Sequence, residues 1–206
     1  MTTLHTSGLG KQHLDDLAEK YFRQDGKEGH FCLLSQICDP ANQPEGDAGV
    51  EIKPSRYGNG LFATRPIAKG TLITIYPGHL IIDFMSETPR IYNFTNNDSE
   101  EDPEYAVAFT DKILYQGNPQ YHGGLCYGHM INDPCTFVGD FNQATKRNIH
   151  LLIRRYKKQA EARANCEFHR STYFVWIRAT KNISPGEEIL LSYGHRYWMK
   201  GVTHLL

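Results

Sequence analysis

The spacing of apolar positions divides the chain into a helical beginning and a longer body of short strands. Within residues 11–24, apolar side chains recur every three to five positions, as on one face of a helix. These positions are Leu14, Leu17, Tyr21 and Phe22. We expect a helix here that lies outside the main fold and either packs on it or meets a partner. Residues 39–49 are rich in Pro, Gly and Asp, which predicts a loop or linker.

From Val50 onward the pattern changes to short runs with high β propensity, separated by Gly, Pro and other turn residues. The runs read VEIK, GLFAT, TLITIY, HLII, YAVAFT, KILY, TYFVWIRAT and EILLSY. They do not alternate with helices, as the strands of a doubly wound parallel sheet do. The predicted fold class is therefore mostly β, with several small twisted sheets.

Residues 141–164 interrupt this β pattern with strong helix formers. The apolar residues Ile149, Leu152, Ile153 and Tyr156 stand at helical spacing and predict an inserted helix. The same stretch holds the one dense group of basic residues in the sequence: Lys146, Arg147, Arg154, Arg155, Lys157, Lys158 and Arg163. Two interpretations stay open, a solvated helix face and a docking surface for nucleic acid or another acidic surface.

Composition narrows the class of protein only modestly. Lysine and arginine number 22 against 23 acidic residues, so a basic nucleic-acid-binding surface, if present, is local. No run of about 18 apolar residues predicts a membrane span, and the first residues do not resemble a secretory signal, so we expect an intracellular protein. The cysteines are odd in number and without Cys-x-x-Cys spacing, which predicts free thiols and no zinc or other metal site. They are Cys32, Cys38, Cys126, Cys135 and Cys166.

Three short motifs carry the candidate chemistry. In the first, Gly58-Asn59-Gly60 lets the backbone turn tightly and approach a ligand, and it precedes a strand, which excludes a phosphate or dinucleotide loop. The second reads GHMINDP over 128–134. The third reads NISPGEEILLSYG over 182–194, and it places Tyr193 where an apolar strand ends and the chain is free to bend.

In this order and spacing, the three motifs resemble those of the SET domain, a β-rich family of lysine methyltransferases, over roughly residues 50–198. The sequence departs from the family at Asp133 and Pro134, where His and Ser are usual. Asn165 and Cys166 look like the end of that motif, displaced by the inserted helix. The family's usual zinc-binding cysteine clusters are missing from this sequence, so the inserted helix, the N-terminal helix or the short tail would have to complete the substrate channel.

The resemblance implies a β-clip-like fold with a knot-like crossing, in which the C-terminal strand threads beside the Asn132 segment. An N-terminal helix and the inserted helix would be added to it. The corresponding division is an N-terminal helical extension and linker at 1–49, a SET domain at 50–198 with a helical insertion at about 136–164, and a tail at 199–206.

The resemblance also implies S-adenosylmethionine as cofactor and methyl transfer to a lysine ε-amine. The implied cofactor-binding residues are Tyr57, Gly58, Asn59, Gly60, Leu61, His129, Ile131, Asn132, Asp133, Tyr193 and Trp198. Tyr193 takes the place of the family's catalytic tyrosine, with Tyr76 and Tyr105 beside it. The implied channel residues are Phe168, Leu191 and Phe109. For Tyr76, Tyr105 and Phe168 core packing is an equal alternative, since aromatic residues are common in β-rich runs.

The expected partner is a protein substrate, with a histone lysine favoured and a nuclear or chromatin-associated location expected. An extended substrate peptide would add as a strand to a free sheet edge near residues 105–110. Two alternatives remain: a degenerate SET module that binds protein or chromatin without catalysis, and a methyltransferase for a non-histone protein. The basic residues between 146 and 163 could add a contact to the nucleosome or to nucleic acid.

Overall fold

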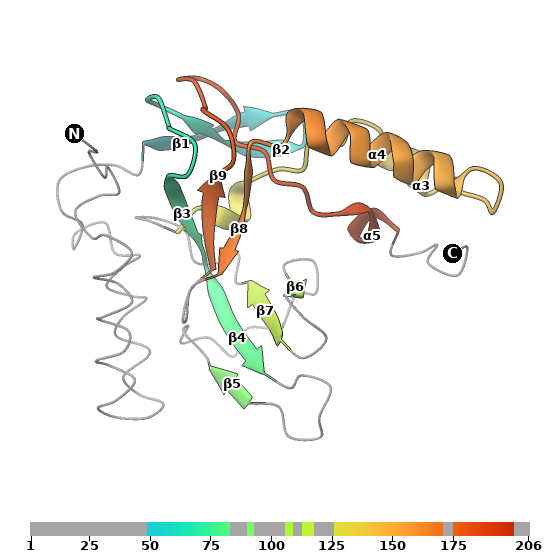
Figure 1. The fold of residues 1–206 in the computed structure, drawn as a ribbon, viewed down its shortest axis with the longest axis horizontal. Coiled ribbons are helices and arrows are strands. Elements are labelled where there is room, and N and C mark those ends of the chain that lie inside the picture. The colour runs from blue at the N-terminus through green and yellow to red at the C-terminus, as the bar shows by residue number, and fades with distance from the viewer. Residues whose placement is uncertain are drawn as a thin grey trace.

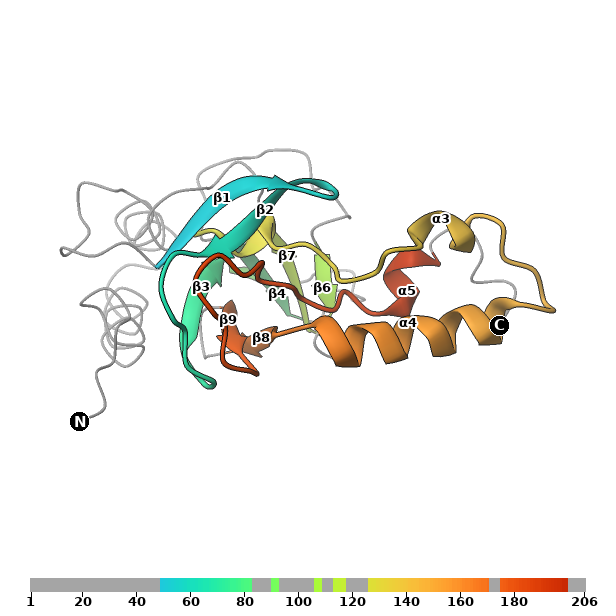
Figure 2. The same ribbon diagram turned by 90° about the horizontal axis from the view of Figure 1, so that it is seen from above.

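The computed structural model describes residues 49–82, 90–92, 106–108, 113–117, 126–170 and 175–199. The predicted N-terminal helix, the tail beyond Met199, Tyr105 and Phe109 lie outside the described residues. In the part described, small antiparallel sheets stand together while a long helix projects away from them (Figures 1 and 2). No helix among these residues is long and apolar enough to cross a membrane.

The first sheet is a hairpin of β1 (Val50–Ser55) and β2 (Gly58–Ala63). Ser55 pairs with Gly58, so Arg56 and Tyr57 alone form the turn. The glycine motif therefore begins the second strand and does not make the turn itself. Gly58 has a φ of 90°, a conformation that glycine adopts without the steric cost that other residues meet.

The second sheet has the order β3-β9-β8, with β3 at Leu72–Tyr76, β8 at Cys166–Arg170 and β9 at Val175–Ala179. The central strand β9 is apolar on both faces: Val175, Trp176 and Ile177 are each at most 1% exposed. A strand buried on both faces does not show the alternation of a half-exposed one, which explains its continuous hydrophobic run.

The third sheet has the order β5-β4-β7-β6. Its strands are β4 (Gly78–Ile82), β5 (Arg90–Tyr92), β6 (Ala106–Ala108) and β7 (Ile113–Gly117). All strand pairs in the three sheets are antiparallel. The prediction of a mostly β body with several small sheets is confirmed.

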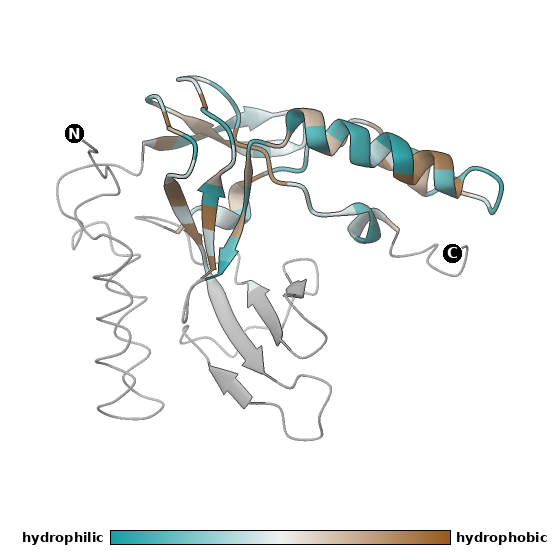
Figure 3. Ribbon diagram, in the orientation of Figure 1, coloured by the Kyte–Doolittle hydropathy of each residue, from teal (hydrophilic) through white to brown (hydrophobic). Residues whose placement is uncertain are grey.

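The helical insertion is observed as two helices, the short α3 (Val138–Phe141) and the longer α4 (Ile149–Arg163). The Asn148 side chain accepts a hydrogen bond from the Thr145 backbone at 2.6 Å, which closes the turn before α4. On the inner face of α4, a hydrophobic cluster joins the insertion to the C-terminal segment. Its buried members are Cys135, Phe137, Phe141, Ile149, Leu152, Tyr156, Ala160 and Met199. Figure 3 shows hydrophobic residues in the first turns of α4 and mostly hydrophilic ones in the remainder of the helix.

The C-terminal segment returns from β9 and lies between two parts of the chain that the insertion separates in sequence. Leu190 bridges in parallel to Asn132, and Leu191 bridges in parallel to Cys166 at the start of β8. The Asn165 side chain completes the arrangement because it accepts from the Leu190 amide at 2.8 Å and donates to the Glu188 carbonyl at 2.9 Å. The predicted adjacency of these segments is thus observed, while the knot-like threading stays a prediction.

The expectation of free thiols holds for two cysteines and is wrong for a third. Cys135 and Cys166 are buried and free. Burial raises the pKa of both thiols, so they stay protonated and pack as small apolar groups. Cys126 is disulfide-bonded, a pairing that the cysteine spacing did not indicate.

Candidate active site

The side chain of Asn132 joins three segments that are distant in sequence. Its amide nitrogen donates to Ser55 Oγ at 2.8 Å, to the Asn59 carbonyl at 3.1 Å and to Glu188 Oε1 at 3.1 Å. An amide nitrogen has two hydrogens, so three acceptors share them. The structure shows no hydrogen bond from the described residues to Asn132 Oδ1, which leaves this oxygen for a donor on a ligand.

Gly60 lies close to this junction. A Cβ atom at this position would stand 2.5 Å from Glu188 Oε1 and 2.8 Å from Asn132 Nδ2. Both distances are shorter than van der Waals contact, so the ends of these two side chains would have to move. Because these are the atoms that hydrogen-bond to each other, a larger residue here would disturb the junction.

The turn η3 (Gly128–Met130) leads into Asn132 and packs against β3. A Cβ at Gly128 would lie 2.7 Å from the Tyr76 Cα, so again only glycine permits the contact. Two predicted cofactor residues are placed by this packing. Both ring nitrogens of His129 are buried, and Ile131 is 1% exposed.

Tyr193 is held at three points around this segment. Its hydroxyl donates to the Ile131 carbonyl at 2.6 Å, next in sequence to Asn132. Its backbone amide donates to Asp133 Oδ2 at 2.7 Å. Its ring stacks on Trp198 at 6.1 Å and meets the edge of Tyr197 at 4.8 Å between ring centres. The predicted residues Tyr193, Asn132, Asp133 and Trp198 are therefore brought together in one place.

Asp133 is the most deeply buried acid of the site, at 4% exposure. Its Oδ1 accepts from the Cys135 amide at 2.7 Å, and its Oδ2 accepts from Tyr193 N and, at 2.6 Å, from Tyr156 Oη. Burial raises the pKa of this carboxyl, and the hydrogen bonds act in the opposite direction. Hydrogen bonds to a charged group each contribute about 1.5–3 kcal/mol, but here they offset only part of the cost of burial, since the net shift of the pKa is upward.

The hairpin turn reaches the same segment from the other side. Tyr57 Oη donates to the Cys135 carbonyl, while the side chain as a whole is 39% exposed. Arg56 donates to the Thr136 carbonyl at 2.8 Å. The predicted residue Leu61 is fully buried, and its carbonyl accepts from the Ile189 amide at 2.8 Å. The predicted loop 57–61 thus contacts both the Asn132 segment and the C-terminal segment.

On the predicted substrate side, Tyr76 and Phe168 form an edge-to-face pair with ring centres 5.4 Å apart. Tyr76 is 7% exposed and Leu191 is 2% exposed. The bridge between Leu191 and Cys166 places the start of β8, which contains Phe168, beside the segment that leads to Tyr193. The assignment of these residues to a lysine channel stays a prediction. The described residues hold no cluster of three or more His, Cys, Asp or Glu that could bind a metal ion.

The model of the SET domain family matches residues 58–194. The chain belongs to the SET domain family. Among solved structures, it is similar to the methyltransferase domain of human PR domain-containing protein 2, with 17% identity, TM-score 0.38, and coverage of 71% of this chain and 78% of that chain. It is also similar to a candidate histone methyltransferase of Plasmodium falciparum, with 20% identity, TM-score 0.36, and coverage of 73% of this chain and 96% of that chain. No curated protein matches the sequence. The family model alone carries the assignment, because both TM-scores are below 0.5.

Within this SET domain, four residues contribute contacts to the site that the sequence analysis does not predict. Ser55 and Glu188 bind the Asn132 amide, and Asn165 fixes the C-terminal segment. Tyr156 was predicted only as an apolar position of the inserted helix, yet its hydroxyl binds Asp133. A buried tyrosine needs a hydrogen-bond partner for its hydroxyl. The unusual acid at 133 is the one signal that could have suggested the pair.

Replacing Gly60 by alanine is expected to destabilise the SET domain by about 1–3 kcal/mol, because the new methyl group overpacks the contact between Glu188 and Asn132. Thermal or denaturant unfolding measures this change. Gly139→Ala is the matched control, since a Cβ there meets no atom within 4 Å and alanine suits the helix α3, so it should leave stability unchanged or raise it by up to about 1 kcal/mol. Equal stability of the two variants would contradict the close approach at Gly60.

Proposed function

We propose that this chain transfers a methyl group from S-adenosylmethionine to a lysine side chain of a protein substrate. One observation carries the proposal: the hydroxyl of Tyr193 is fixed on the Ile131 carbonyl, immediately beside Asn132. The tyrosine implied to be catalytic and the asparagine implied to hold the cofactor are therefore neighbours, although 61 positions separate them in the sequence (193 − 132). Membership of the SET domain family supports the same activity.

The residues around this junction fit the proposed cofactor. Asn132 Oδ1 is an acceptor suited to an ammonium group. Trp198 and the two tyrosines packed on it present aromatic faces, which favour a sulfonium charge. The predicted loop from Tyr57 to Leu61 would lie along the methionine part of the cofactor. When bound, S-adenosylmethionine supplies an already activated methyl group.

The chain itself must then orient and deprotonate the incoming amine. The Tyr193 hydroxyl donates a hydrogen bond to the Ile131 carbonyl, which orients its oxygen, an atom that can accept a hydrogen bond from the amine. A free lysine amine has a pKa of about 10.4, and an apolar site lowers it because burial disfavours the charged form. We assign Tyr76, Phe168 and Leu191 to such an apolar channel, with Tyr105 and Phe109 as further members outside the described residues.

For the substrate we propose an extended protein segment, with a histone lysine as the first candidate and a nuclear location to match. The strand order places β6 (Ala106–Ala108) at the edge of its sheet, where a peptide could add as a further strand. A non-histone substrate uses the same geometry. A catalytically inactive module that binds protein or chromatin remains the competing proposal, motivated by Asp133 in place of the family's histidine.

Tyr193→Phe is expected to lower the rate of methyl transfer at least about 100-fold, since it removes the hydroxyl that would orient the amine in the transition state. Binding of S-adenosylmethionine should stay within threefold, because the ring and its stacking remain. Steady-state kinetics with tritiated cofactor and calorimetric titration measure the two effects.

Tyr127→Phe is the matched control for this substitution. The structure shows no hydrogen bond from the Tyr127 hydroxyl to another described residue, so its removal should leave the rate unchanged. Equal rates for wild type and Tyr193→Phe would instead support the inactive module if neither transfers methyl groups, or a different catalytic residue if both do.

We also propose that the outer face of α4 binds nucleic acid. Five basic side chains on or just before this helix are exposed, and none of them forms an ion pair with a described residue. They are Lys146, Arg147, Arg154, Lys157 and Lys158. Leu151, Arg154 and Lys158 follow one another at helical spacing, and Leu151 is 66% exposed. Because the helix projects from the sheets, this face is accessible along its length (Figure 3).

The double variant Arg154→Glu/Lys158→Glu should weaken binding of a fluorescein-labelled DNA duplex at least about tenfold, and should lower the slope of log K against log salt by about two. Fluorescence anisotropy at several salt concentrations measures both quantities. Lys53→Glu/Lys69→Glu changes the net charge equally on a different surface and is expected to bind as wild type. If both pairs weaken binding to the same extent, net charge and not the α4 face is responsible.

A further inference from the structure

Three side chains on one face of the inserted helix α4 form hydrogen bonds with the segment that follows Asn132. Tyr156 binds Asp133 at 2.6 Å, Gln159 binds Thr136 through two hydrogen bonds of 3.1 and 2.9 Å, and Arg163 donates to the Pro134 carbonyl at 3.0 Å. Positions 156, 159 and 163 are spaced by three and four residues, so they share one side of the helix. The contacts are therefore a property of the helix as a unit.

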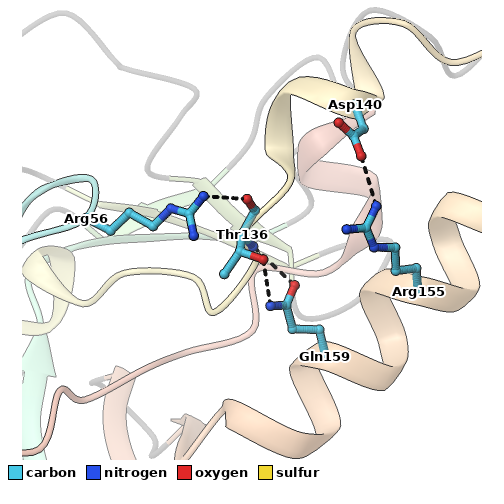
Figure 4. Close-up of polar contacts among 5 residues, drawn as sticks. All are labelled: Arg56, Thr136, Asp140, Arg155 and Gln159. Atoms are coloured by element: carbon cyan, nitrogen blue, oxygen red, sulfur yellow. Dashed lines mark hydrogen bonds and ion pairs between the residues drawn. The ribbon is translucent and has the colours of Figure 1, made fainter.

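Gln159 binds Thr136 at two points. Its Oε1 accepts from the Thr136 amide and its Nε2 donates to Thr136 Oγ1, so both ends of the side-chain amide are used (Figure 4). The Thr136 carbonyl accepts from Arg56 in the hairpin turn. Arg155 forms an ion pair with Asp140 at 3.0 Å and so ties α4 to α3. A continuous set of contacts thus leads from α4 to the predicted cofactor loop.

Tyr156 also reaches the C-terminal segment directly. Its hydroxyl donates to Asp133 Oδ2, accepts from the Gly194 amide at 2.8 Å, and lies 2.9 Å from Ser192 Oγ. The same Asp133 oxygen accepts from the Tyr193 amide. The backbone on both sides of the Tyr193 Cα is consequently fixed by two side chains, Asp133 on its own amide and Tyr156 on the next.

The charge states of the pair agree with this bonding. Burial first, and Asp133 second, raise the pKa of Tyr156 above its ordinary value, so the hydroxyl keeps its proton and donates. The rotamers open to the Tyr193 side chain depend on its backbone conformation, and in the observed conformation its hydroxyl donates to the Ile131 carbonyl. Loss of the hydrogen bond from either Asp133 or Tyr156 would allow the backbone at Tyr193 to change its conformation.

We propose that Asp133 and Tyr156 are positioning residues for the Tyr193 hydroxyl, and that the inserted helix α4 is thereby a working part of the methyl-transfer site. This inference rests on the proposed methyltransferase function. Asp133 occupies a position where the family usually has histidine, and Tyr156 comes from a helix that divides the family motif. The two departures from the family pattern therefore compensate each other.

The test is a double-mutant cycle on the full chain, with tritiated S-adenosylmethionine and the protein mixture that the wild type labels best, core histones first. Tyr156→Phe keeps the ring and removes the hydroxyl. It should lower kcat about tenfold, which corresponds to about 1.4 kcal/mol, and should change KM for the cofactor less than twofold. In the Tyr193→Phe background the same substitution should lower kcat less than twofold, because the hydroxyl that it positions is already absent.

Two further variants separate positioning from general destabilisation. Ile149→Val loosens the core beneath α4 without touching a polar group, so its kcat should stay within twofold of wild type. Asp133→Asn replaces one acceptor oxygen by an amide NH2 group, which donates and cannot accept, so it should behave as Tyr156→Phe does. This variant keeps the proposal testable if Tyr156→Phe does not fold.

The outcomes distinguish a failure of the positioning role from a failure of the proposed methyltransferase function. A tenfold loss from Tyr156→Phe in both backgrounds, an unchanged kcat, or an equal loss from Ile149→Val overturns the positioning role while the methyltransferase stands. A wild-type chain that labels no protein overturns the proposed function, and the positioning role with it.

Discussion

The site depends on one crossing, in which the segment from Glu188 to Leu191 lies between Asn132 and the start of β8. Each of these neighbours offers a single parallel bridge, and β2 adds an antiparallel bridge from Phe62 to Glu188. The side chains of Asn132 and Asn165 add hydrogen bonds to Glu188 and to the backbone on either side of Ile189. Tyr193 comes two residues after Leu191, so the position of its hydroxyl depends on the contacts of the preceding segment.

Two glycines allow other segments to pack closely around this crossing. Gly60 and Gly128 let two further segments approach within distances at which a Cβ would collide with Glu188 or with the backbone of Tyr76. At Gly128 the constraint is the approach of two backbones, and at Gly60 it is the space needed by the hydrogen-bonded side chains of Glu188 and Asn132. The insertion extends the same logic, since α4 fixes residues 133–136 by hydrogen bonds from one face and leaves its basic outer face exposed.

Much of this arrangement could be predicted from the sequence, for identifiable reasons. Most strands, the inserted helix and the meeting of Asn132 with Tyr193 follow from periodicity and from the resemblance of short motifs to the SET domain. The prediction of a strand at EILLSY is wrong, because this segment forms only isolated bridges, and the strands β5 and β8 were not predicted. Individual polar contacts could not be predicted in the same way. Tyr156 occupies an apolar position of a helical stripe, and nothing in the spacing indicates that its hydroxyl meets Asp133. Cys126 shows the same limit, because its disulfide depends on tertiary contacts that spacing does not encode.

The most direct test of the central claim is methyl transfer from labelled S-adenosylmethionine to core histones, nucleosomes and total cell protein, with the labelled residue located by mass spectrometry. The account predicts label on lysine ε-amines of at least one of these proteins. Absence of label from all three, together with no cofactor binding by calorimetry, would contradict it and would favour a SET domain that acts through binding alone.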